Sequence, residues 1–370
     1  MRFGLGWRAE LGAGIIAHLD RIDVLEVLAE DFFEATRDQR KALRFLRTQV
    51  PIVLHGTSLG LASTAPVDRK RLDAIARVIA WLEPESWSEH LAFVRAGGTE
   101  VGHLAAPPRN DATLAGLVRN VEEARRVTGS LPLLENVASL IEPPLCSYDE
   151  ESWLHAVLAA TSGDLLLDLH NVYANGVNFG FDSEHVVRSL PGDCVGGVHL
   201  AGGRRVERGR VLDDHLHGVP NEVFALLSCV NATEANVILE RDGNYPPIEV
   251  LLEELDRARD VIRSVERGSW AGAAGLSLAP HPPRSLAHAR DDIAFLAQLY
   301  TDEAARARFF ANPEAEARSA GFNETEARDV ARMNLDDLRL AARGFEKKRA
   351  AKARSRESPS RTPHRKTSRA

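Results

Sequence analysis

The chain has 370 residues, of which 44% are hydrophobic and 27% are charged, as in an ordinary globular protein. No run approaches the roughly 18 consecutive apolar residues of a membrane span, and no apolar signal-peptide stretch begins the chain, so we expect a cytoplasmic protein without a membrane partner. The net charge is -7, yet Lys and Arg are concentrated in residues 347–370. The remaining, strongly acidic part is therefore not expected to bind nucleic acid.

Eight short apolar runs alternate with segments of helical periodicity along the first part of the chain. The runs cover residues 3–7, 24–30, 50–56, 86–94, 131–137, 164–171, 195–202 and 236–242. They are too continuous for half-exposed antiparallel strands. This alternation predicts a (β/α)8 TIM-type barrel over residues 1–267. A doubly wound open sheet is the alternative, but the first run is not followed by the phosphate-binding GxGxxG of that fold.

The last hundred residues predict a different organisation. Residues 268–285 are rich in Gly, Pro and Ser, as in a linker. Residues 286–346 have a helical pattern, so we expect a small helical module there. Residues 347–370 are basic and low in apolar residues, which predicts a disordered tail.

Polar side chains mark the carboxyl ends of seven consecutive runs. They are Glu30, His55, His90, Glu135, Asp168 with Asn171, His199, and Glu240 with Asp242. The stretch VLDDHLHG at 211–218 follows the seventh run and adds further carboxylates and imidazoles. Strand ends of a barrel meet on one face, where such buried charges would repel one another unless cations neutralised them. The set therefore predicts a metal site.

The types and number of these side chains narrow the choice of metal. Imidazole and carboxylate ligands without thiolates suit iron, manganese or zinc. The three cysteines have no CxxC spacing, so neither a thiolate zinc site nor a disulfide framework is indicated. About nine candidate ligands exceed what one ion can use, and two or three metal ions are expected.

Nine motifs in order carry a family resemblance over roughly residues 3–260. They are GLGWR, LEVLAEDFF, VLHGTSLGL, SEHLAF, LLENVASL, LLLDLHNVY, VHLAGG, LDDHLHG and ILERDGN. In these motifs the chain resembles the multinuclear non-heme iron-dependent oxidative enzymes. That (β/α)8 family includes the methanobactin-maturation oxidase and other modifiers of ribosomally made peptides.

The resemblance implies a set of metal ligands. All of them except Asn171, which has an amide side chain, would also be the catalytic residues. The implied ligands are His55, His90, Glu135, Asp168, Asn171, His199, Asp213, His215 and Glu240. The family spacing D-x-H selects Asp213 and His215 over Asp214 and His217. The chain departs from the family pattern at Asp31, which stands where an amide is usual, and at His170, which we expect to be a solvent- or core-facing residue.

The resemblance also implies an activity and its participants. The cofactor would be two or three irons in mixed Fe(II)/Fe(III) states with O2 as cosubstrate. The substrate would be a Cys, or sometimes an Asp, of a precursor peptide, and a separate leader-binding protein would be a partner. We expect the helical module to contribute to peptide recognition. Residues that could contact substrate are Arg8, Glu30, Tyr173, Asn175, His217 and Arg241, with Arg204, Arg205 and Asn178 as further candidates.

Three other functions share parts of this pattern. Sugar isomerases and abasic-site endonucleases also gather His, Asp and Glu around metals on barrels. The acidic body disfavours the endonuclease. The isomerase would need a catalytic lysine or a paired-carboxylate base near the metals, and no predicted strand ends in lysine. An iron-containing peptide-binding module without catalysis is the alternative from another class.

Overall fold

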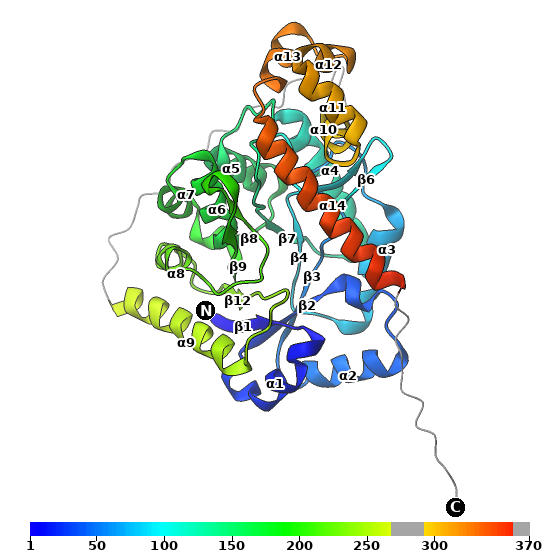
Figure 1. Cartoon of the computed structure of the whole chain (residues 1–370). Helices are drawn as coiled ribbons and strands as arrows, with labels where there is room; N and C mark the ends of the chain where they lie inside the picture. The colour runs from blue at the N-terminus through cyan, green and yellow to red at the C-terminus, as the bar shows by residue number, and fades with distance from the viewer. Residues whose placement is uncertain (268–291, 358–370) are drawn as a thin grey trace, which may run out of the picture.

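The computed structural model describes residues 1–267 and 292–357, and in it eight parallel strands form a closed barrel (Figure 1). The strands are β1 (Arg2–Gly6), β2 (Val24–Leu28), β3 (Ile52–His55), β4 (Trp87–His90), β7 (Leu133–Glu135), β8 (Leu165–Asp168), β9 (Val195–Leu200) and β12 (Asn236–Leu239). Strand β1 pairs with both β2 and β12, for example Phe3 with Val237, which closes the sheet. The predicted (β/α)8 barrel is confirmed, and each predicted apolar run overlaps one strand of the barrel.

Helices surround the barrel and follow its strands. They are α1 (Gly12–Ala17), α2 (Arg37–Arg47), α3 (Arg69–Leu82), α4 (Asp111–Thr128), α5 (Glu150–Thr161), α6 (Leu169–Phe179), α7 (Ser183–Ser189), α8 (Asn221–Leu227) and α9 (Ile248–Arg267). Local caps fix several ends. Thr36 and Gln39 form a capping box at the start of α2, and the Asp168 side chain caps α6 by accepting from the Asn171 N–H. Asp168, the last residue of β8, is thus also the N-cap of the helix that follows.

Two short hairpins extend the loops above the barrel and were not predicted. They are β5 (Phe93–Ala96) with β6 (Thr99–Ala105), and β10 (Arg204–Arg205) with β11 (Val211–Leu212). The predicted run 86–94 therefore contains the whole of β4 and the start of β5. Gly97 and Gly98 have φ of 54° and 77°, a left-handed turn that glycine adopts without steric cost.

The C-terminal helical unit packs on the first of these hairpins. It consists of α10 (Asp292–Thr301), α11 (Glu303–Ala311), α12 (Pro313–Ser319), α13 (Glu324–Val330) and α14 (Leu335–Glu357). Phe93, Val101, Phe295 and Leu338 belong to one apolar cluster, separate from the cluster around the barrel strands. In Figure 1 the long helix α14 runs across the region above β4 and β3.

The boundary of the predicted tail needs correction. Helix α14 continues to Glu357, whereas the helical module was expected to end at residue 346. The residues after 346 are mainly Ala, Lys, Arg and Glu, which favour helix, and Arg349 contacts strand β6. The predicted linker 268–285 and residues 358–370 of the predicted tail lie outside the described residues. Within the described residues, no helix is long and apolar enough to span a membrane.

Candidate metal centre

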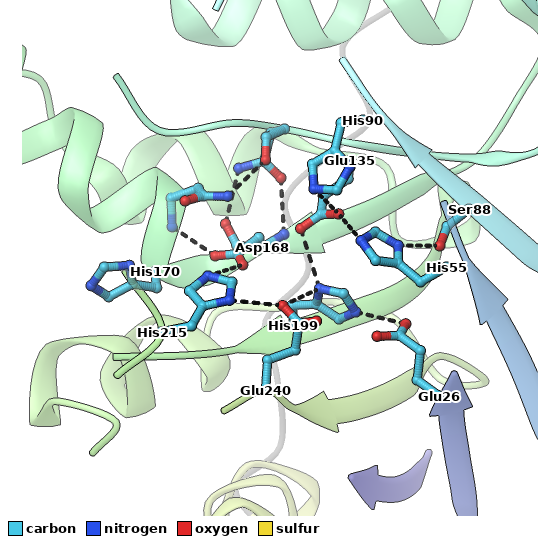
Figure 2. Close-up of polar contacts among 12 residues, drawn as sticks. Glu26, His55, Ser88, His90, Glu135, Asp168, His170, His199, His215 and Glu240 are labelled. Atoms are coloured by element: carbon cyan, nitrogen blue, oxygen red, sulfur yellow. Dashed lines mark hydrogen bonds and ion pairs between the residues drawn. The ribbon is translucent and has the colours of Figure 1, made fainter. Parts of the chain in front are cut away.

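A first set of candidate ligands lies where β3, β4 and β7 end (Figure 2). Oε2 of Glu135 is 3.3 Å from Nε2 of His55 and 3.1 Å from Nε2 of His90. The opposite ring nitrogens are held in place: Nδ1 of His55 is 2.7 Å from Oγ of Ser88, and Nδ1 of His90 is 3.1 Å from the Gly56 carbonyl oxygen. When each Nδ1 donates to its oxygen, Nε2 keeps a lone pair directed at Glu135, as a metal ligand requires.

A second set shares Glu135 and adds side chains from the neighbouring strands. Atoms of Glu135, Asp168, His199 and Glu240 lie within 4.8 Å of one another, and all four residues are buried. Nδ1 of His199 is 3.2 Å from Oε1 of Glu135 and 3.3 Å from Oε2 of Glu240. The two oxygens of Glu135 therefore face different ligand sets. The arrangement can hold two metal ions with Glu135 between them.

Four buried polar atoms of the side chains expected as metal ligands have no hydrogen-bond partner. They are Oε2 of Glu135, Oδ2 of Asp168, Oδ1 of Asn171 and Nε2 of His215. Buried polar atoms are rarely left unpaired, because losing water without a replacement partner is costly. A bound metal ion would supply the partner that each of these atoms lacks. The donor set therefore fits metal ions.

The loop after β9 places Asp213 and His215 beside the second set. Nε2 of His215 is 2.9 Å from Oδ1 of Asp213, and Nδ1 of His215 is 3.2 Å from Oε2 of Glu240. Neither residue belongs to the two compact groups above. Their role as metal ligands stays a prediction. In the same loop, Nδ1 of His217 is 3.0 Å from Oδ1 of Asp214.

His170 and Glu26 contact the candidate ligands from outside. His170 is buried, and its Nδ1 is 2.9 Å from Oδ1 of Asp213, so it orients a candidate ligand. Oε2 of Glu26 is 2.9 Å from Nε2 of His199, which leaves Nδ1 of His199 for a metal. Glu26 was missed because it lies within the apolar run of β2 and not at its end. An acidic residue inside an otherwise apolar strand was the available signal.

Glu89 and the buried asparagines position the loops around the site. Glu89 accepts hydrogen bonds from the backbone N–H groups of Ser58, Leu59 and His90, which holds the loop after β3. Asn136 exchanges two hydrogen bonds with the backbone of Asp168. Sequence reasoning named none of these contacts, because all except the contact between Glu89 and His90 join residues that are about 30 positions apart in the chain.

The clustered charges shift the pKa values of the metal-free site. Burial alone would lower the pKa of His90, but Glu135 and Glu89 outweigh it and raise that pKa to about 9. Burial, followed by the charge of Asp213, raises the pKa of Asp168 to about 7. Burial also opposes the charged form of His199, yet Glu240 and Glu26 raise its pKa well above the usual value. The metal-free site therefore retains protons that a metal ion would displace.

The residues expected to contact substrate have different surroundings. Arg8 lines the cavity above the ligands and pairs with Asp242. The other five contact neighbouring protein groups. Glu30 accepts a hydrogen bond from the Thr57 N–H, and Asn175 accepts one from the Ser139 N–H. His217 pairs with Asp214, Arg241 pairs with Glu254, and Tyr173 packs near His170. None of these five is among the cavity-lining residues of the described chain. Their contribution to substrate binding stays a prediction.

The cavity above the ligands has a volume of about 300 Å³. One side of it, which we call the floor, consists of His55, His90, Glu135 and Glu240, with Asn171, Asp213 and His215 beside them. Another side, which we call the outer wall, consists of Tyr300, Ala341, Gly344, Phe345 and Lys348 from α10 and α14. The cavity thus lies between the barrel and the C-terminal unit.

The floor belongs to a part of the chain that matches a known family. The model of the RiPP precursor modification enzyme MbnB/TglH/ChrH, in which RiPP denotes a ribosomally made and modified peptide, matches residues 2–263. The chain belongs to this family. The family inferred from the motifs is thereby confirmed. The match ends before α10, so the outer wall lies outside the part that defines the MbnB/TglH/ChrH family.

Curated relatives of the chain are UPF0276 proteins. One from Bordetella bronchiseptica is 33% identical over 262 residues, covering 69% of this chain and 91% of that protein. One from Pseudomonas aeruginosa is 33% identical over 268 residues, covering 70% of this chain and 92% of that protein.

Solved structures share the barrel at low sequence identity. Endonuclease IV from Thermus thermophilus is 17% identical with a TM-score of 0.48, covering 71% of this chain and all 100% of that one. D-Psicose 3-epimerase from Clostridium cellulolyticum is 15% identical with a TM-score of 0.46, covering 72% of this chain and 99% of that one.

Proposed function

We propose that this MbnB/TglH/ChrH family member is a multinuclear iron enzyme that uses O2 to oxidise a Cys or an Asp residue of a ribosomally made precursor peptide. One observation carries the proposal: the two oxygens of Glu135 face two buried ligand sets, one with His55 and His90 and one with His199. A shared carboxylate between two such sets is suited to a multinuclear centre.

The donor atoms support iron as the metal. They are imidazole nitrogens and carboxylate oxygens with no thiolate, a set that iron, manganese and zinc share. Of these metals, iron is the one we propose, because the oxidation proposed above needs redox chemistry, which iron supplies when bound. Removal of four electrons and four protons from the peptide would reduce one O2 to two waters, so an oxidase reaction needs no organic cosubstrate.

The protein's own residues would prepare the centre and the substrate. Ser88 and Glu26 orient the rings of His55 and His199. Arg8 is buried beside Glu240 and Asp242, where it offsets part of the negative charge of the floor. The peptide would enter the cavity between the floor and the outer wall, and a separate protein that binds the leader of the precursor would present it.

Metal analysis after anaerobic purification tests the proposal. We expect two or three irons per chain by elemental analysis, and O2 consumption when the precursor peptide is added. Zinc or manganese at full occupancy would contradict the iron proposal and favour the isomerase alternative. Bound iron with peptide binding but no O2 consumption would favour the non-catalytic binding module.

A matched pair of variants shows whether the ligand sets hold the metal. His199→Ala should lose iron and O2 consumption. Glu150→Gln replaces a carboxylate that is equally buried but pairs with Arg109 away from the floor, and it should retain both. Retention of iron and activity by His199→Ala would remove His199 from the ligand assignment.

A further inference from the structure

The outer wall is firmly attached to the barrel loops. Nη1 of Arg349 donates to the Val101 carbonyl oxygen at 2.9 Å, and the ring centroids of Phe345 and His103 are 6.0 Å apart. A Cβ atom on Gly102 would lie 2.2 Å from Cγ of Arg349, so α14 approaches β6 as closely as a glycine permits. Helix α14 therefore holds its side chains in a defined position over the cavity.

The cations that line the cavity have different partners. Arg8 pairs with Asp242, and Nη2 of Arg71 is 2.9 Å from Oε1 of Glu100. Lys348 also lines the cavity, but no carboxylate of the described residues lies within ion-pairing distance of it. Among the described Lys and Arg side chains that line the cavity, it is the one without a directly paired carboxylate.

Lys348 is held by a neutral partner. Its Nζ is 2.5 Å from Nε2 of His103, on strand β6. Burial and the nearby Lys348 charge lower the pKa of His103 well below its usual value, so the ring is uncharged and accepts a hydrogen bond. An ammonium group has three donors, so two remain for a ligand in the cavity.

We propose that Lys348, positioned by His103, binds a carboxylate of the peptide substrate at the outer wall. The inference rests on the proposed function for the identity of the substrate as a peptide. It adds that the reacting side chain lies at the floor while an anionic group is held on the opposite side. A cavity of about 300 Å³ accommodates only a small part of a peptide, so the carboxylate lies close to the reacting residue.

Two peptide groups supply this carboxylate, namely the C-terminus or an acidic side chain, and three short probes separate them. The first is an acetylated Gly-Ala-Cys tripeptide with a free carboxylate. The second is the same tripeptide with a C-terminal amide. The third is an acetylated Gly-Asp-Cys amide. Binding of each to the full-length, metal-loaded protein is measured anaerobically by isothermal titration calorimetry.

For the wild type, we expect a carboxylate-bearing probe to bind about 10-fold more tightly than the neutral amide, since a charge-assisted hydrogen bond of this kind contributes a factor of that order. Lys348→Met should reduce the ratio to below about 2-fold, and Lys348→Arg should retain most of it. Lys347→Met is the matched control, because Lys347 is the exposed neighbour on the same helix. It should leave the ratio unchanged.

The outcomes separate this inference from the proposed function. Equal affinity of the wild type for all three probes, or no binding of any, would overturn carboxylate recognition while iron content and O2 consumption remain as separate readouts. An unchanged ratio in Lys348→Met would overturn it as well. A charge-dependent ratio in a protein that binds no iron would support the inference and contradict the proposed function.

Discussion

The floor and the outer wall of the cavity are built in different ways. His55, His90 and Glu135 of the floor lie at strand ends, are buried, and each contacts another buried polar side chain. Phe345 and Lys348 of the outer wall are half-buried and come from a helix beyond the family match. In our proposal the floor carries the chemistry, and the outer wall contributes to recognition of the substrate.

The largest expected effect concerns the shared ligand. Glu135→Gln removes a charge that faces both ligand sets, so we expect loss of at least one metal per chain and a fall in activity of more than about 100-fold, beyond the range typical of residues that only orient ligands. Elemental analysis and O2 consumption measure the two effects. Full metal content in this variant would show that the two sets do not depend on a common carboxylate.

The charges of the floor predict a pH dependence for the metal-free protein. The pKa of His90 is raised to about 9 in the folded state, against about 6.5 in an unfolded chain. This group therefore stabilises the fold fully below pH 6.5, and the stabilisation, on the order of 3 kcal/mol, disappears as the pH rises towards 9. Between these pH values the free energy of unfolding, measured with urea, should fall less in His90→Asn than in the wild type. Identical pH profiles would contradict the assignment.

Residues that orient the ligands should matter less than the ligands themselves. Glu26→Gln weakens the contact to Nε2 of His199 without removing the ring, and we expect a 10- to 100-fold loss of metal affinity, as is typical of such partners. Competition with a chelator measures the affinity. Glu150→Gln again serves as the control and should bind metal like the wild type. An unaltered affinity in Glu26→Gln would mean that packing alone orients His199.

The smallest expected effect concerns the attachment of the outer wall. Gly102→Ala and Gly98→Ala both place a side chain at a positive φ, of 83° and 77° respectively, and each should cost about 1 kcal/mol of stability. Only Gly102→Ala also collides with Arg349, whereas the space around Gly98 is open. We therefore expect weaker binding of the carboxylate probe in Gly102→Ala alone, with metal content unchanged in both. Equal probe binding by the two variants would show that substrate recognition does not depend on the position of α14.

Much of the barrel and its rim could be predicted because the signals are local. A strand of a parallel barrel is buried on both faces, so its sequence is a run of apolar residues. A polar residue such as Glu135 marks its end. The C-terminal unit was predicted only as a helical module. Its contact with β5 and β6 depends on side chains some two hundred residues away, and residues beyond 346 were interpreted as a solvated basic tail from their composition.

By itself, the sequence determines the fold and the types of ligand at the barrel rim, because the length and end of each buried run are properties of neighbouring residues. Only the tertiary structure decides that Glu135 faces two ligand sets, that Glu26 orients His199, and that Lys348 lies over the cavity. These relations depend on distances between residues on different strands and helices. No periodicity along the chain encodes them.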